Sequence, residues 1–105
     1  MYVTEVLSWQ ANSGVTDSQM INAIEGIVSD LKTLPGFLFE TLAKGEKGEW
    51  QQVYFWRTQA QAHDSNQLMA DKASMQQLMH LIKSDTLSMS VMVPVQDSGP
   101  FDLFA

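Results

Sequence analysis

Residues 37–57 read FLFETLAKGEKGEWQQVYFWR, and this stretch decides the fold. Its two apolar runs, 37–44 and 49–57, are rich in the aromatic and β-branched residues that favour strands. They flank the sequence GEKG at 45–48, whose glycines are typical of a tight turn. The stretch therefore predicts an antiparallel hairpin.

The residues before the hairpin predict one strand and one helix. The run 2–9 (YVTEVLSW) favours a strand, and Asn, Ser and Gly within 10–15 favour a loop. Thr16 followed by Gln19 forms a capping-box pattern at the start of a helix. Apolar residues then recur at helical spacing as far as Pro35-Gly36, which ends the helix.

The residues after the hairpin predict a helix in two parts and a last strand. Thr58 with Gln61 is a second capping-box pattern, and it opens a helix that runs to about Ala70. Ser74 with Gln77 opens a further helical segment, so we expect a bend or break near 71–73. The run 87–95 alternates apolar and polar residues like a strand, and the tail 96–105 is acidic and aromatic.

The order of these elements predicts an α+β fold. Strand, helix, strand, strand, helix, strand is the order of the ferredoxin-like βαββαβ sandwich, with a four-stranded antiparallel sheet and two helices on one face. A chain of 105 residues is the size of one domain, which we place at 1–95, followed by the C-terminal tail 96–105.

Composition excludes several classes of function. The formal charge is -6, which argues against the basic surface that nucleic-acid binding needs. Cysteine is absent, which excludes disulfides, thiolate chemistry and cysteine metal sites. No apolar run reaches the roughly 18 residues of a membrane span, and no signal-peptide pattern is present, so we expect a cytoplasmic protein that binds no membrane.

The strands carry apolar residues on both faces of the predicted sheet. Trp50, Tyr54 and Trp56 share one face of their strand, and Val53 and Phe55 occupy the other. Helices on one side leave the second apolar face bare, which monomers rarely tolerate over a large area. We therefore expect a homodimer that joins the two sheet faces across a two-fold axis.

The strand 37–44 supports the same expectation. Strict alternation places Phe37 and Phe39 on one face, opposite Leu38 and Leu42.

The sequence resembles the dimeric α/β-barrel proteins grouped with the antibiotic-biosynthesis monooxygenases. The resemblance lies in LPGF at 34–37, GEW at 48–50, VYFW at 53–56 and the closing LSMSV at 87–91. It spans about residues 2–95 and implies a homodimer with facing sheets and a pocket between each sheet and its helices. Some members of the family oxidise aromatic substrates without a cofactor, some degrade haem, and many have no assigned reaction.

Two polar residues of the second helix are candidate catalytic groups. Helical projection places Asn66 between Ala62 and Met69 on the apolar side, with His63 on its flank. His63 is the candidate general base, because an unperturbed imidazole titrates near neutrality, and Asn66 is a candidate hydrogen-bonding group of a cavity. The alternative is that both are surface residues of a polar helix, and a solvated position is also expected for His80.

Six further residues are candidate substrate-binding groups. Aromatic rings stack on flat molecules, methionines line apolar cavities, and an arginine clamps an anionic oxygen. The alternative for these side chains is core packing, or a surface ion pair for the arginine. The candidates are Trp9, Tyr54, Trp56, Arg57, Met69 and Met89.

The family's chemistries transfer only in part. Haem-degrading members use an Asn on the first strand and a Trp and a His on the second helix, and this chain has neither that Asn nor that Trp. Cofactor-free oxygenating members use Asn, Trp, Tyr and Arg, and these residue types occur here as Asn66, Trp56, Tyr54 and Arg57.

Two functions stay open. The first is binding of a hydrophobic or aromatic small molecule, with cofactor-independent monooxygenation in which His63 or a water takes a phenolic proton and Asn66, Tyr54 and Trp56 hold the oxyanion and ring. The second is a non-catalytic dimeric binding or structural module with no open pocket. Neither reading calls for a cofactor or a metal ion.

Overall fold

A computed structural model describes residues 1–99 of the chain. Residues 100–105, the larger part of the predicted tail, lie outside the described residues. The helices and strands follow in the order β1 (Val3–Trp9), α1 (Asp17–Leu31), β2 (Phe37–Lys44), β3 (Trp50–Trp56), α2 (Gln59–Ala70), α3 (Ala73–Leu81), a 3₁₀ turn (Ser84–Thr86) and β4 (Ser88–Met92).

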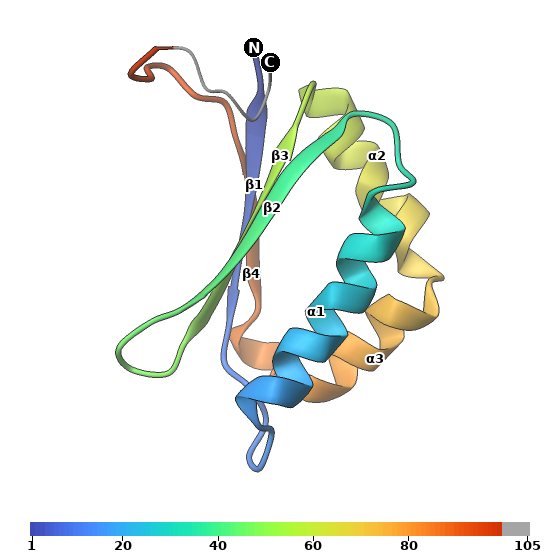
Figure 1. The fold of residues 1–105 in the computed structure, drawn as a ribbon, viewed down its shortest axis with the longest axis vertical. Coiled ribbons are helices and arrows are strands. Elements are labelled where there is room, and N and C mark those ends of the chain that lie inside the picture. The colour runs from blue at the N-terminus through green and yellow to red at the C-terminus, as the bar shows by residue number, and fades with distance from the viewer. Residues whose placement is uncertain (100–105) are drawn as a thin grey trace.

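The predicted α+β architecture is confirmed. The four strands form one sheet in the order β2-β3-β1-β4, and every neighbouring pair is antiparallel. All three helices lie against the same face of this sheet, as Figure 1 shows. None of the helices within residues 1–99 is long and apolar enough to cross a membrane.

Helix α1 forms as predicted. The Thr16 side chain accepts a hydrogen bond from the Gln19 backbone N–H, and the Gln19 side chain accepts one from the Thr16 backbone N–H, which completes the capping box. The apolar stripe then buries Met20, Ile24 and Ile27 against the sheet and the neighbouring helices.

The predicted break in the second helix is also confirmed, since α2 ends at Ala70 and α3 begins at Ala73. The Thr58 side chain caps α2 by accepting a hydrogen bond from the Gln61 backbone N–H, but Oε1 of Gln61 accepts none in return, so the capping box is incomplete. The prediction that the further helical segment opens at Ser74 is wrong. The helix starts one residue earlier, and the Ser74 hydroxyl donates instead to Oδ2 of Asp30 on α1 at 2.5 Å.

The two faces of the sheet alternate in β1 and β3 as predicted. Side chains at alternate positions of both strands are buried beneath the helices, among them Trp50, Tyr54 and Trp56. Val53 and Phe55 lie on the opposite face, where Phe55 packs against Phe39 with ring centroids 5.7 Å apart. We call this opposite face the free face, because no helix of residues 1–99 lies against it (Figure 1).

The prediction for β2 is wrong at one residue. A bulge between Phe37 and Phe39 shifts the register, so Phe37 pairs with Trp56 on the helix-facing side and only Phe39 lies on the free face. An extra residue at Leu38 reverses the alternation before it, which strict period-two counting does not anticipate.

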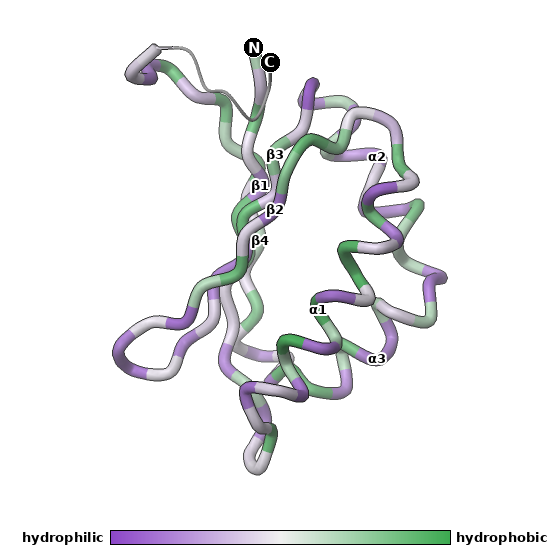
Figure 2. Tube along the Cα trace, in the orientation of Figure 1, coloured by the Kyte–Doolittle hydropathy of each residue, from purple (hydrophilic) through white to green (hydrophobic). Residues whose placement is uncertain are grey.

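The last strand is shorter than predicted. Hydrogen bonding to β1 covers Ser88–Met92 and stops before Pro94, which has no N–H to donate. The loop between β2 and β3 projects away from the helices and is hydrophilic, as Figure 2 shows.

The contact between Ser74 and Asp30 generates a prediction about the packing of α3 on α1. Ser74→Ala and Asp30→Ala should each lower the free energy of unfolding by about 1–2 kcal/mol, because each leaves a partly buried polar group without its partner. The double variant should cost less than the sum of the two single variants, as measured by urea denaturation. Additive losses would contradict the contact.

Candidate functional site

Four polar side chains lie on the helix-facing side of the sheet, among the apolar core. Glu5 of β1 and Glu40 of β2 both pair in register with Tyr54 of β3, so the three residues form one row across three strands. Gln52 lies two residues from Tyr54 on the same face and is fully buried. The antiparallel register thus gathers residues that are up to 49 positions apart in the chain.

Directional hydrogen bonds connect three of these side chains. The Tyr54 hydroxyl donates to Oε1 of Gln52 at 2.7 Å. The Gln52 amide donates in turn to Oε2 of Glu40, also at 2.7 Å. Each bond fixes the orientation of the next group, so Gln52 links the buried phenol to the carboxylate of Glu40.

Glu5 is the most deeply buried carboxyl group of the described residues, with no exposed surface. The Trp56 indole N–H donates to Oε1 of Glu5 at 3.2 Å, and Oε2 has no hydrogen-bond partner. Burial raises the pKa of Glu5 to about 7, because the charged form loses its hydration, and the Trp56 hydrogen bond lowers it by a smaller amount. A substantial fraction of Glu5 is therefore protonated at neutral pH.

The other two titratable groups of the row shift in the same direction. Burial raises the pKa of Glu40, and the hydrogen bond from Gln52 partly offsets this. Burial, and then the negative charges of Glu5 and Glu40, raise the pKa of Tyr54 well above its usual value. Tyr54 therefore stays protonated and acts as a hydrogen-bond donor.

An open groove lies between α1 and the edge strand β2. Its volume is about 380 Å³, within the size range of small-molecule sites. One wall is a face of α1 and the other is the helix-facing side of β2. The lining residues are Ile21, Ile24, Glu25, Val28, Ser29, Lys32, Glu40 and Leu42.

Glu40 connects this groove, which we call the α1–β2 groove, to the buried row. Its carboxylate lines the groove and accepts the Gln52 hydrogen bond through Oε2. Among the described residues, its Oε1 accepts no hydrogen bond from the protein, so that oxygen is available to a ligand.

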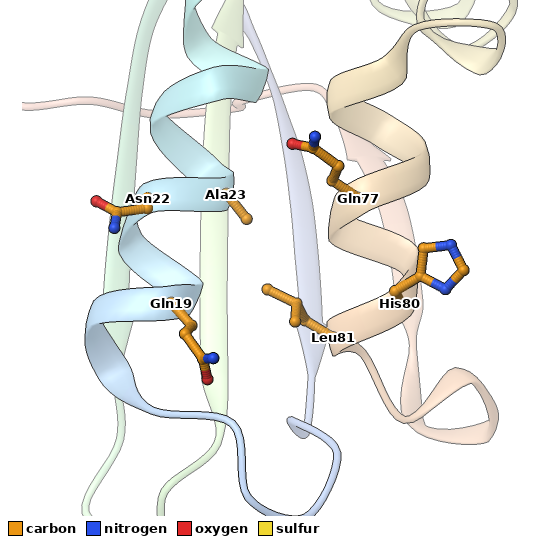
Figure 3. Close-up of a pocket in the computed structure, with 6 residues that line it drawn as sticks. All are labelled: Gln19, Asn22, Ala23, Gln77, His80 and Leu81. Atoms are coloured by element: carbon orange, nitrogen blue, oxygen red, sulfur yellow. The ribbon is translucent and has the colours of Figure 1, made fainter.

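A second groove, of about 430 Å³, lies between α1 and α3 on the outer side of the helices. Figure 3 shows that Gln77 and Leu81 lean toward α1, while the His80 ring points away from it. The expectation that His80 is solvated is confirmed, since its side chain is exposed. This groove is lined by amides, small apolar groups and His80 without a carboxylate, so it lacks the anionic anchor that Glu40 supplies to the first groove.

The predicted substrate-binding residues fall into a buried and an exposed group. Trp9, Tyr54, Trp56 and Met69 are at most 5 % exposed and belong to the core, and neither groove includes them in its lining. Arg57 and Met89 are exposed. The structure thus brings Tyr54 and Trp56 beside Glu5, and it does not bring the six residues together around one cavity.

The predicted catalytic residues lie at the surface of α2. This helix buries Ala62, Ser65 and Met69, whereas His63 and Asn66 are exposed. The projection of Asn66 onto the apolar side is wrong, because Ser65 holds the inward position and the next residue is turned by about 100° from it. The catalytic role of either residue stays a prediction.

Sequence reasoning missed Glu5, Glu40 and Gln52, although a signal was present for two of them. Glu5 has the same parity as Val3 and Leu7 in β1, and Gln52 has the same parity as its buried aromatic neighbours in β3. A polar residue at an inward position of a strand is costly unless it is hydrogen-bonded, which makes it a candidate for function.

The described residues offer no group of three or more His, Cys, Asp or Glu side chains that could hold a metal ion. The expected independence from metals and cofactors is not tested by this and stays a prediction.

Comparisons with known proteins find similarity in structure alone. No family model matches the sequence, and no curated protein matches it. Solved structures do match over nearly the whole chain. SnoaB, a cofactor-independent oxygenase from Streptomyces nogalater, superimposes with a TM-score of 0.73 at 13 % identity, covering 91 % of this chain and 95 % of SnoaB.

Two other structures agree with this match. A candidate antibiotic biosynthesis monooxygenase from Chloroflexus aurantiacus has a TM-score of 0.67 at 20 % identity, covering 94 % of this chain and 98 % of the other. Rv0793 from Mycobacterium tuberculosis has a TM-score of 0.73 at 11 % identity, covering 94 % of this chain and 100 % of the other. The chain therefore has the antibiotic-biosynthesis-monooxygenase type of ferredoxin-like fold, as its resemblance implies, and at these identities the likeness extends to the fold alone.

The buried carboxyl of Glu5 generates a prediction for stability against pH. The native state holds a proton on Glu5 up to about pH 7, while an unfolded chain releases it near the ordinary value of 4.5. The contribution of Glu5 to the free energy of unfolding is therefore fully present below pH 4.5. It falls by about 3 kcal/mol as the pH rises to about 7 and stays constant above that.

Glu5→Gln should remove most of this slope, as measured by urea denaturation between pH 4 and 8. A smaller slope of the same sign should remain from Glu40. Glu46→Gln, in the exposed β2–β3 loop, is the matched control and should keep the full slope. Equal slopes for the Glu5 variant and the wild type would show that Glu5 is ionised in the native state.

Proposed function

We propose that the protein binds a small, flat, largely apolar molecule in the α1–β2 groove. The observation that carries this proposal is the groove itself, whose volume of about 380 Å³ exceeds the roughly 300 Å³ at the lower end of ligand sites. A non-catalytic module without an open pocket would fill the space between sheet and helix with its own side chains.

The walls of the groove support an apolar ligand. Ile21, Val28 and Leu42 present aliphatic surface to it, and Ile21 is 45 % exposed. Covering such surface is worth roughly 25 cal/mol for each Å² removed from water. A flat ring system covers two opposing walls at once, which supports the expectation of an aromatic ligand.

Glu40 supplies the polar anchor of the proposed site. Its free oxygen accepts a hydrogen bond from an O–H or N–H group of the ligand, and the Gln52 amide holds the carboxylate in place. The half-buried position makes this bond stronger than one at a fully hydrated carboxylate. Glu40 thus orients the ligand and discriminates in favour of molecules that carry a donor.

Cofactor-independent oxygenation of the bound molecule is the second candidate function. It is supported by the SnoaB-like fold and by the raised pKa of Glu40, which makes this carboxylate a better base than an ordinary one. In this reaction Glu40 takes the proton of a ring hydroxyl, and the electron-rich anion donates electrons to O₂. A ring CH₂ becomes a carbonyl, one oxygen atom enters the product, and the other leaves as water.

Substitution of Glu40 tests both functions. Glu40→Gln should weaken binding of dihydroxyaromatic compounds about tenfold, since the charge-assisted hydrogen bond is lost, and should abolish any oxygen uptake that they support. His63→Ala is the comparison, because His63 is the base predicted from the sequence.

The measurements are thermal-shift titration for binding and an oxygen electrode for turnover. Loss of oxygen uptake in His63→Ala with full activity in Glu40→Gln would assign the base to His63. Undiminished binding by Glu40→Gln would remove Glu40 from the ligand site.

We further propose that the functional unit is a homodimer joined through the free face. This face carries aromatic and aliphatic groups at its centre, including Phe39, Phe55, Val53 and Val6. Where β1 meets β4, the Ser8 and Ser88 hydroxyls form a hydrogen bond with each other. A second copy related by a two-fold axis offers the same apolar surface in return and removes both from water.

Disruption of the free face tests the dimer. The wild type should sediment at twice the 11.8 kDa of the chain at micromolar concentration. Val53→Lys places a charge at the centre of the proposed interface and should give a folded monomer. Leu68→Lys changes an exposed leucine of α2 in the same way and should leave the dimer intact. A monomeric wild type would overturn the interface.

A further inference from the structure

Three charged side chains surround the α1–β2 groove without forming an ion pair. Glu25 lies on α1, Lys32 directly follows the last residue of that helix, and Glu40 lies on β2. Within residues 1–99, the ion pair found is between Lys44 and Asp17, with Nζ and Oδ1 2.7 Å apart. The groove charges are therefore not neutralised by one another, and they face whatever occupies the groove.

Of the three charged side chains, the Glu40 carboxylate is the least exposed to water. Glu40 is half-buried on the wall of the groove, and its hydrogen bond to Gln52 prevents it from turning out to solvent. Lys32 is exposed, and its long flexible stem carries the ammonium into water. Glu25 adds a second negative charge from the opposite wall. The groove therefore has two carboxylates and one well-hydrated ammonium, which leaves an excess of negative charge.

We propose that the ligand of the α1–β2 groove carries a positively charged nitrogen, held between Glu25 and Glu40, on an apolar body that lies along Ile21 and Leu42. This inference rests on the proposed binding function of the groove, and it names the charge of the ligand. An amine or amidine meets the description.

Other charge classes fit the groove less well. An anion meets two carboxylates, and the net charge of -6 on the chain adds to the repulsion. A neutral alcohol or phenol donates one hydrogen bond to Glu40 and gains nothing from Glu25. A cation is attracted by both carboxylates. Its charge also lowers the pKa of Glu40 and so opposes the effect of burial, which raises that pKa.

Three probes with one ring system test the inference on the full chain. They are 2-naphthylmethylamine, 2-naphthalenemethanol and 2-naphthoic acid, which are cationic, neutral and anionic at pH 7.5. We expect the amine to bind about tenfold more tightly than the alcohol, and the acid more weakly than the alcohol, as measured by isothermal titration calorimetry. The preference for the amine should shrink at high salt, because exposed charges are screened.

Charge-removing variants locate the preference. Glu40→Gln should reduce the amine-to-alcohol ratio about tenfold, and Glu25→Gln about threefold, because Glu25 is the more exposed of the two. Lys32→Gln should raise the ratio. Glu46→Gln removes one negative charge in the β2–β3 loop and should leave the ratio unchanged.

The outcomes separate this inference from the proposed function. Equal binding of amine and alcohol by the wild type would overturn the inference and leave apolar binding in the groove intact. A preference that survives both Glu25→Gln and Glu40→Gln would overturn it too, because the cation would then lie elsewhere. Failure of all three probes to bind would overturn both the inference and the proposed groove.

Discussion

The hydrogen bond from Gln52 to Glu40 joins the interior of this protein to its surface. On one side of it, Gln52 is buried beneath the helices and accepts a bond from Tyr54. On the other side, Glu40 lines the α1–β2 groove. Because the amide is held at both ends, the carboxylate keeps one orientation, and the groove has a fixed polar point on otherwise aliphatic walls. The proposed ligand site depends on that bond.

The register of the sheet explains why these groups meet. Glu5, Tyr54 and Glu40 pair across three strands, so a shift of one residue in either pairing would turn a carboxyl group to the other face. Burying an ionised carboxylate costs free energy, and the raised pKa of Glu5 reflects this cost. A purely structural core would be more stable with apolar residues at these positions, which is a physical reason to connect them with function.

The fold could be predicted from local chemistry. The capping box at Thr16, the hairpin around GEKG and the break before Ala73 are all consequences of neighbouring residues, and all are confirmed. The site could be predicted only in part, because it depends on register. The bulge at Leu38 and the inward turn of Ser65 in place of Asn66 arise from tertiary packing, and a helix with few apolar residues does not reveal its buried face. Glu5 and Gln52 were visible as polar residues of inward parity, but their partners come from distant strands.

The central claim is that a small molecule occupies the groove between α1 and β2. Methyl NMR with isoleucine and leucine labelling, during titration with 2-naphthalenemethanol, tests it most directly. The claim predicts saturable shifts at Ile21, Ile24 and Leu42, with Ile27 and Leu81 unmoved. Shifts confined to Leu81 in the α1–α3 groove, or no saturable shifts at the three groove residues, would contradict it.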